Sequence, residues 1–131
     1  MKQTGILNRD LSAVIAALGH TQSIVIGDCG LPIPDGVPVI DLALVPGTPS
    51  FLLTLRAVLG ELVTERAVIA SEMPEKNPAV YAQTVRLLDG IPCRQCPHED
   101  FKRLTEQARC VIRTGECTPY SNVILYGGVN F

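Results

Sequence analysis

The chain has 131 residues, of which 47% are hydrophobic, and its formal net charge at pH 7 is −2. This length predicts a single domain over residues 1–131, and the apolar content excludes a disordered chain. The small negative charge, with no cluster of Lys and Arg, argues against a nucleic-acid partner.

The apolar segments are short and are interrupted by Gly, Pro or charged residues. None reaches the roughly 20 residues that span a bilayer. Residues 1–10 also lack the apolar segment of a signal peptide. We therefore expect a soluble, cytoplasmic protein with no membrane contact, whose five cysteines are reduced thiols.

Apolar residues alternate along the chain between a helical period and short runs typical of buried strands. The clearest helical pattern is 50–63, which places four apolar residues on one stripe. In chain order, we predict a helix at 11–18, a strand at 23–27, a rigid Gly- and Pro-rich loop at 28–38, a strand at 39–45, a helix at 50–63, a strand at 67–70, a helix at 77–88, a weak strand at 91–93, a helix at 97–108, and strands at 110–113 and 123–126.

Residues that start and stop helices flank two of these segments. Asn8 or Asp10 is expected to cap the first helix, and Gly19 to close its end. Asn77 is expected to cap the helix that has Pro78 at its first position.

The alternation of strands and helices predicts an α/β fold. We expect three layers, with a largely parallel central sheet of about six strands and helices on both of its faces. Ligands of such sheets bind in loops at the carboxyl ends of strands. Two loops are therefore of interest: the one that begins at Asp28 and the one before the last strand.

The chain has two histidines, His20 and His98. Histidine is the side chain best suited to move protons near neutral pH. His20 follows Gly19 at the expected end of a helix, where the helix dipole favours an imidazolium. His98 begins the helix predicted at 97–108. Taken alone, each histidine also fits an ordinary surface position at a helix terminus.

Asp28 lies between Gly27 and Cys29, and these small neighbours leave room for a ligand near the backbone. A carboxylate at this position can accept hydrogen bonds from sugar hydroxyls, or it can anchor the amides of its own loop. The residues alone leave both interpretations open.

The polar segment 113–122 joins the last two predicted strands and ends in Tyr120, Ser121 and Asn122. Sugars are commonly bound by such mixtures, because hydroxyls need amide partners and C–H faces need an aromatic ring. The same Gly- and Pro-containing segment is also consistent with a plain connection between strands.

Cys93 and Cys96 have the spacing of redox and zinc motifs, but there is no second pair of ligands at matching spacing. His98 and Cys110 would be needed to complete a site. We therefore expect no metal.

Several motifs follow one another in a specific order: Gly-Ile-Leu-Asn at 5–8, Leu-Gly-His-Thr at 18–21, Asp-Cys-Gly-Leu-Pro-Ile-Pro at 28–34, Ile-Asp-Leu-Ala-Leu at 40–44, Pro-Gly at 46–47, His-Glu-Asp-Phe-Lys at 98–102, and Ile-Arg-Thr-Gly-Glu-Cys-Thr-Pro-Tyr-Ser-Asn at 112–122. In this order they resemble the D-ribose pyranase family, whose relatives include the L-fucose mutarotases. The resemblance covers nearly the whole chain, although residues 50–95 match only generically.

The resemblance implies an isomerase without a cofactor, which interconverts the β-pyranose and β-furanose forms of free D-ribose by acid–base ring opening and reclosure. It implies that His20 is the catalytic acid. The residues that it implies for substrate binding are Asp28, His98, Tyr120, Ser121 and Asn122; Ser121 is small, so its contact is expected through the backbone. Lys102 is a weaker candidate. The chain departs from the family at Cys29 and Cys117, where non-thiol residues are expected.

The resemblance also implies a homo-oligomer, a decamer of stacked pentameric rings. From this we expect the loop 120–122 to complete the pocket of a neighbouring chain, with His20 and Asp28 supplied by the other protomer. The apolar C-terminal residues Val129 and Phe131 fit burial against a neighbour.

Three alternatives remain from the sequence. An L-fucose mutarotase would share the His and Asp but would exchange the anomers of a deoxyhexose. A non-catalytic sugar-binding partner of a transport system would need the pocket without the acid. A thiol-redox protein is a more distant alternative.

Overall fold

The computed structural model describes the whole chain, residues 1–131. Its strands are β1 (Ser23–Gly27), β2 (Val39–Asp41), β3 (Thr64–Ala70), β4 (Cys93–Cys96), β5 (Val111–Arg113) and β6 (Val123–Gly127). Its helices are α1 (Arg9–Ala17), α2 (Phe51–Leu59), α3 (Met73–Lys76), α4 (Pro78–Leu88) and α5 (His98–Thr105). None of these helices has both the length and the apolar character needed to cross a bilayer.

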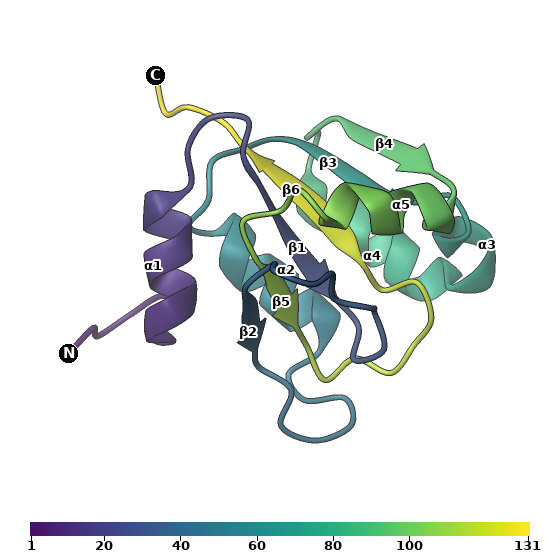
Figure 1. Cartoon of the computed structure of the whole chain (residues 1–131), viewed down its shortest axis with the longest axis horizontal. Coiled ribbons are helices and arrows are strands. Elements are labelled where there is room, and N and C mark those ends of the chain that lie inside the picture. Colours follow the sequence, from purple (N-terminus) through teal and green to yellow (C-terminus); the bar gives the residue numbers. More distant parts are fainter.

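The six strands form one sheet in the order β2-β5-β1-β6-β3-β4 (Figure 1). β1 pairs in parallel with β5, β5 with β2, and β3 with β4. β6 is antiparallel to both of its neighbours, β1 and β3. Five strands therefore point the same way, and the predicted largely parallel sheet of about six strands is confirmed.

The sheet is packed on both faces, because side chains alternate along each strand. In β1, Ile24 and Ile26 join the larger core under α1, α2, α3 and α4. Val25 points to the opposite face, where it joins the smaller core under α5 and the loop 28–38. Figure 1 shows α5 in front of the sheet and α2 and α4 behind it. The predicted three-layer α/β arrangement is confirmed.

The first helix begins as predicted and ends differently. The side chain of Asn8 accepts a hydrogen bond from the Leu11 amide at 2.8 Å, so Asn8 is the N-cap. The last helical residue is Ala17, Leu18 after it is extended, and Gly19 does not take the left-handed conformation of a closing glycine. The prediction for Gly19 is therefore wrong.

Asn77 is the N-cap residue of α4, before Pro78, as predicted, but it does not cap the helix through its side chain. Its amide nitrogen instead donates to the segment 118–121, at distances of 2.9 to 3.0 Å. Tertiary contacts have redirected a residue whose local sequence suits a helix start.

Several other predicted boundaries shift. β2 ends at Asp41 rather than at 45, because the Asp41 carboxylate accepts the Ala43 amide and turns the chain out of the sheet. α2 stops at Leu59, before Gly60. β4 begins two residues later and ends three residues later than the weak strand predicted at 91–93, and α3 was not predicted.

Candidate active site

A carboxylate and an amide meet where β1 ends and β6 begins. The Asn122 side chain accepts the Asp28 amide at 2.8 Å and donates to the Asp28 carboxylate at 3.0 Å. Asn122 is buried, and Asp28 is half-buried. The pair exists because β1 and β6 are antiparallel neighbours, so the end of one lies beside the start of the other.

The ionised form of Asp28 is partly desolvated. Burial raises the pKa of the Asp28 carboxyl, and hydrogen bonds from the Gly30 amide and from Asn122 oppose part of that rise. A half-buried carboxylate with unused lone pairs is a strong acceptor for hydroxyl groups. The carboxylate of Asp28 thus anchors an amide of its own loop, which was the second of the two interpretations. Its remaining lone pairs are still available to a ligand.

Close backbone packing holds these two loops together. A Cβ on Gly27 would lie 2.7 Å from Leu31 and 3.1 Å from the Asn122 amide oxygen, so a larger residue would push these side chains out of place. The buried Thr114 donates its hydroxyl to the Gly27 carbonyl at 2.8 Å. A Cβ on Gly115 would collide with the backbone of Thr48.

Two rings lie in this cluster. The His98 ring contacts Tyr120 edge-on, with centroids 5.1 Å apart, and stacks beside Phe101 at 6.1 Å. Its Nδ1 is buried and has no hydrogen-bond partner. A buried unpaired nitrogen costs about 1–3 kcal/mol, and a ligand hydroxyl at this atom would remove that cost. Tyr120 has a φ of 58°, a left-handed conformation that is uncommon for a non-glycine residue.

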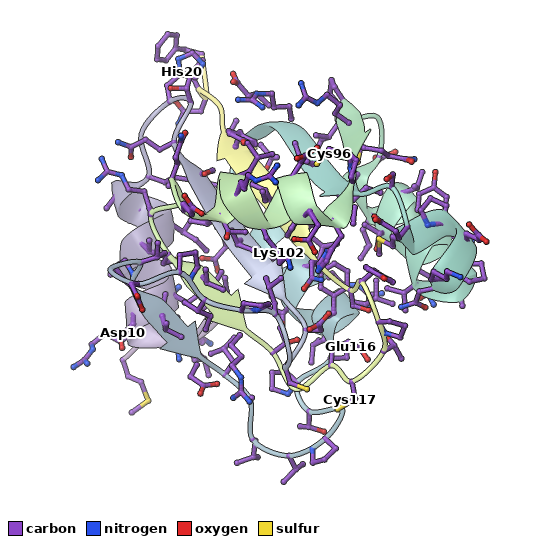
Figure 2. All side chains as sticks on the ribbon, turned by 45° about the vertical axis from the view of Figure 1, so that its right-hand side comes forward. Asp10, His20, Cys96, Lys102, Glu116 and Cys117 are labelled. Atoms are coloured by element: carbon purple, nitrogen blue, oxygen red, sulfur yellow. The ribbon has the colours of Figure 1, made fainter.

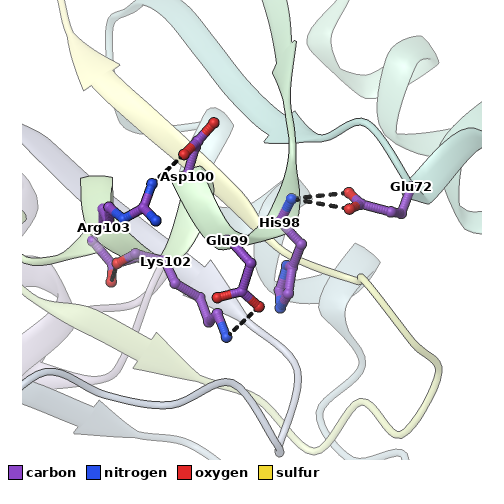
Figure 3. A network of polar contacts seen from close by, with 7 residues as sticks. Glu72, His98, Glu99, Asp100, Lys102 and Arg103 are labelled. Atoms are coloured by element: carbon purple, nitrogen blue, oxygen red, sulfur yellow. Dashed lines mark hydrogen bonds and ion pairs between the residues drawn. The ribbon is translucent and has the colours of Figure 1, made fainter.

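The start of α5 is fixed by a residue of another element. Both carboxylate oxygens of Glu72 accept the His98 amide, at 3.0 and 3.1 Å (Figure 3). This hydrogen bond lowers the pKa of the Glu72 carboxyl. Lys102 on the same helix is paired with Glu99 at 2.8 Å. The weaker candidate Lys102 is thus already engaged at the surface of α5.

Ser121 is fully buried, and its hydroxyl is hydrogen-bonded to Asn77 at 3.0 Å and to Thr118 at 2.8 Å. These bonds hold the turn that presents Tyr120 and Asn122. The side chain of Ser121 therefore has no free face for a sugar, and the residue as a whole is buried.

His20 lies elsewhere. It is exposed, in the turn between α1 and β1, and its Nε2 is 2.8 Å from a carboxylate oxygen of Glu65 on β3. It lines a hollow of about 330 Å³ together with the C-terminal residues 127–131. β1 separates His20 from Asp28, and its five residues rise about 17 Å. Figure 2 shows His20 at one end of the molecule and Glu116 and Cys117 at the other.

This placement corrects the expected division of the pocket. His20 and Asp28 do not form one protomer's half, because they lie at opposite ends of β1. Asp28 instead pairs with Asn122 of its own chain. The sequence-predicted residues therefore fall into two groups: Asp28, His98, Tyr120, Ser121 and Asn122 at one end, and His20 at the other.

Sequence reasoning missed Glu72 and Asn77, which position the site from a distance. Asn77 was assigned to a helix cap, and no motif marks Glu72. Both act through contacts with residues at least 26 positions away in the chain, which no local pattern reveals.

Cys93 and Cys96, which have the spacing of redox and zinc motifs, lie in a strand of the sheet. Both lie in the edge strand β4, where Cys93 is exposed and Cys96 is buried. No group of three or more His, Cys, Asp or Glu side chains in the chain is placed to hold a metal ion.

The fold and the site together are typical of a protein that binds a small polyhydroxylated ligand. A carboxylate, an amide, an imidazole and a phenol gather at strand ends of a small α/β domain, the arrangement of polar groups and rings that suits a small polyhydroxylated ligand.

Comparison with known proteins shows to which family this chain belongs. The sequence model of the RbsD / FucU transport protein family matches residues 1–130. A D-ribose pyranase of Laribacter hongkongensis is 58% identical over the full length of both chains. The chain belongs to the RbsD / FucU family.

Two solved structures share the fold. The Bacillus subtilis RbsD complexed with D-ribose superposes with a TM-score of 0.97 at 46% identity, covering 100% of both chains. The Streptococcus pneumoniae fucose mutarotase in complex with L-fucose has a TM-score of 0.85 at 19% identity, also over 100% of both chains. At that identity, the second likeness concerns the fold alone.

Proposed function

We propose that this chain is a D-ribose pyranase, an isomerase that interconverts the β-pyranose and β-furanose forms of free D-ribose. The observation that carries the proposal is the full-length 58% identity to a D-ribose pyranase, in a chain whose fold matches an RbsD that binds D-ribose. The polar cluster around Asp28 supplies the hydroxyl-binding groups that such a substrate needs.

The reaction moves protons and needs no electron acceptor. The anomeric hydroxyl loses a proton and becomes a carbonyl, while the bond from that carbon to the ring oxygen breaks and the ring oxygen gains a proton. A different hydroxyl then attacks the carbonyl carbon and closes the smaller ring; it loses its proton, and the carbonyl oxygen gains one and becomes the new anomeric hydroxyl. This chemistry needs a positioned acid, a base that accepts the proton of the hydroxyl, and a fixed sugar.

The residues divide these tasks by their chemistry. His20 protonates the ring oxygen, and the Glu65 carboxylate at 2.8 Å orients its ring. Asp28 and Asn122 bind hydroxyls, and His98 and Tyr120 flank the sugar.

The two groups must come from different chains, because a pentose is much shorter than the roughly 17 Å rise of β1. The active pocket is therefore shared: His20 of one protomer meets the Asp28 cluster of a neighbour. This arrangement supports the homo-oligomer expected from the sequence, a decamer of stacked pentameric rings. A cytoplasmic location is part of the same proposal, and cell fractionation tests it.

Two alternatives have specific support. The family model covers FucU as well as RbsD, which makes an L-fucose mutarotase the second candidate. The description of the family as transport proteins favours a non-catalytic sugar-binding partner of a transporter.

Saturation-transfer NMR on free D-ribose, with and without the protein, tests the proposal directly. We expect the protein to accelerate pyranose–furanose exchange, and to accelerate it more than the exchange of L-fucose anomers measured in parallel. Faster exchange of fucose would assign the protein to the mutarotases. Ribose binding without any acceleration would support the transport partner.

A further inference from the structure

Two thiols lie side by side next to the Asp28 cluster and have no part in the proposed reaction. Cys29 follows Asp28 in the loop after β1, and Cys117 lies in the loop between β5 and β6. They are 88 residues apart in the chain, and their Sγ atoms are 3.7 Å apart. Figure 2 shows Cys117 at the surface, beside Glu116.

The backbone maintains this proximity. The Cys29 amide donates to the Glu116 carbonyl at 2.9 Å, and the Arg113 Nε donates to the Cys29 carbonyl at 3.2 Å. Both bonds join the loop after β1 to the segment that carries Cys117. The two thiols therefore meet because their chain segments are tied together, and not through a chance rotamer of one side chain.

The pair is also accessible, unlike the buried thiols. Cys29 is half-exposed and Cys117 is exposed, and both line a surface hollow of about 290 Å³. Cys96 and Cys110 are buried, and burial raises the pKa of the Cys110 thiol to about 11. Cys93 is exposed but has no thiol partner within hydrogen-bond distance.

We propose that Cys29 and Cys117 form a redox modification site, which a small-molecule disulfide converts into an intramolecular disulfide that slows the sugar reaction. One cysteine thiolate attacks the small disulfide and releases its first thiol. The second cysteine then attacks this mixed disulfide and releases the other thiol. The two cysteines are oxidised by two electrons, the small disulfide is reduced to two thiols, and the cysteine protons end on those thiols.

Formation of the disulfide should displace residues of the proposed sugar site, because both cysteines are close to that site in the chain. A disulfide has an S–S distance of about 2.05 Å, so the two sulfurs must approach by more than 1 Å. Cys29 is bonded to Asp28, and Cys117 is three residues from Tyr120. Displacements of about 1 Å in a site can lower turnover by about 100-fold. We therefore expect the disulfide form to exchange ribose at least about tenfold more slowly.

The hydrogen bond with Cys117 raises the pKa of the Cys29 thiol. Because a thiolate is the attacking species, formation of the disulfide should accelerate as the pH rises.

The test treats the full-length protein with oxidised glutathione, maps disulfides by mass spectrometry of non-reduced peptides, and measures ribose exchange by NMR before and after a dithiol reductant. The double variant Cys29→Ser, Cys117→Ser is compared with Cys93→Ser, Cys96→Ser, which has the same number of thiols. We expect a bond between 29 and 117 in the parent, a reversible loss of exchange in the parent and in the 93/96 variant, and no loss in the 29/117 variant.

The activity measurement rests on the proposed function, but the mapping does not. Absence of a 29–117 bond after oxidation would overturn the modification site, and a bond without a change in exchange would overturn its effect on the sugar reaction. If the reduced parent does not accelerate exchange, the proposed function and the effect on it both fail, and the mapping still decides whether the site forms.

Discussion

At the scale of single residues, two carboxylates set the chemistry of the two groups. Glu65 meets the ring of His20 at 2.8 Å in an exposed turn, so the histidine is oriented but remains open to a partner. Asp28 is half-buried and bonded to Asn122. Under the proposed function, His20 would therefore move a proton at the surface, while Asp28 and Asn122 would hold hydroxyls in a less polar environment.

Replacing His20 tests its role as the acid. His20→Ala should lower the acceleration of ribose exchange by about 100-fold or more, because it removes the general acid. The fold should persist, because an exposed substitution changes stability by only about 0.5 kcal/mol. NMR exchange rates and thermal melting measure the two effects. Glu65→Gln, which keeps a hydrogen-bond partner for the ring, should cause a smaller loss, and a His20→Ala rate equal to that of the parent would refute the assignment.

The raised pKa of Asp28 leads to a prediction about how the KM for ribose changes at acid pH. Burial raises its pKa above the ordinary 3.8, so the carboxylate gains its proton at a higher pH than an exposed Asp does. A protonated Asp28 accepts fewer hydrogen bonds, and the KM for ribose should therefore rise as the pH falls toward this raised pKa. The profile is measured by NMR exchange between pH 4 and pH 8. In Asp28→Asn the KM should be high at every pH, and an unchanged acid limb in this variant would show that another group titrates.

At the scale of elements, α5 depends on a cap from outside. Its own N-cap position is Pro97, which provides no side-chain acceptor, and Glu72 takes that role from the start of α3. A carboxylate at a helix N-terminus is also favoured by the helix dipole. Because the capped amide is that of His98, the same contact fixes where the His98 ring enters the site.

Removing this cap should destabilise the protein. Glu72→Ala should lower the free energy of unfolding by about 0.5–2 kcal/mol, the usual cost of losing a cap. The folded-state pKa of Glu72 is lowered below its ordinary 4.5, so its charge stabilises the protein above that pH and stops doing so as the pH falls through the lowered pKa. Denaturant titrations at neutral and acid pH should therefore show a gap between parent and Glu72→Gln that closes in acid. A gap that persists there would mean that the carboxylate charge is not its source.

At the scale of the whole molecule, the two groups of site residues lie at opposite ends of one strand. Within a single chain, the proposed acid His20 is therefore far from the proposed hydroxyl-binding cluster around Asp28. Under the proposed function, assembly of copies would bring one of each into a shared pocket. The apolar residues that remain exposed at the C-terminus, Val129 and Phe131, are suited to the interfaces that such an assembly needs.

Complementation between inactive variants tests the shared pocket. His20→Ala and Asn122→Ala should each be nearly inactive, but mixed oligomers refolded from equal amounts should regain about a quarter of the parent activity, since a quarter of the pockets receive both intact halves. NMR exchange measures the regain, and mass spectrometry confirms the mixing.

The matched control is a mixture of Asp28→Ala with Asn122→Ala. Asp28 and Asn122 belong to one cluster of one chain, so no pocket in this mixture is intact and activity should stay absent. Equal recovery in both mixtures, or a monomer in sedimentation, would contradict the shared pocket.

Local patterns determined much of this protein. The alternating apolar runs predicted the α/β layers. The cap at Asn8 could be predicted from residues within one helical turn. The ordered motifs indicated the family and the candidate site residues. These features depend on neighbours in the chain, where side-chain periodicity and capping operate.

Only the tertiary structure decided how those residues are grouped. The antiparallel placement of β6 beside β1 joins Asp28 to Asn122, 94 residues away, and the length of β1 separates His20 from both. The same packing turned Asn77 away from its helix, recruited Glu72 to α5 and brought Cys29 to Cys117. Strand order and loop packing depend on burial and hydrogen bonding between residues far apart in the chain. Local sequence patterns do not show which distant residues meet.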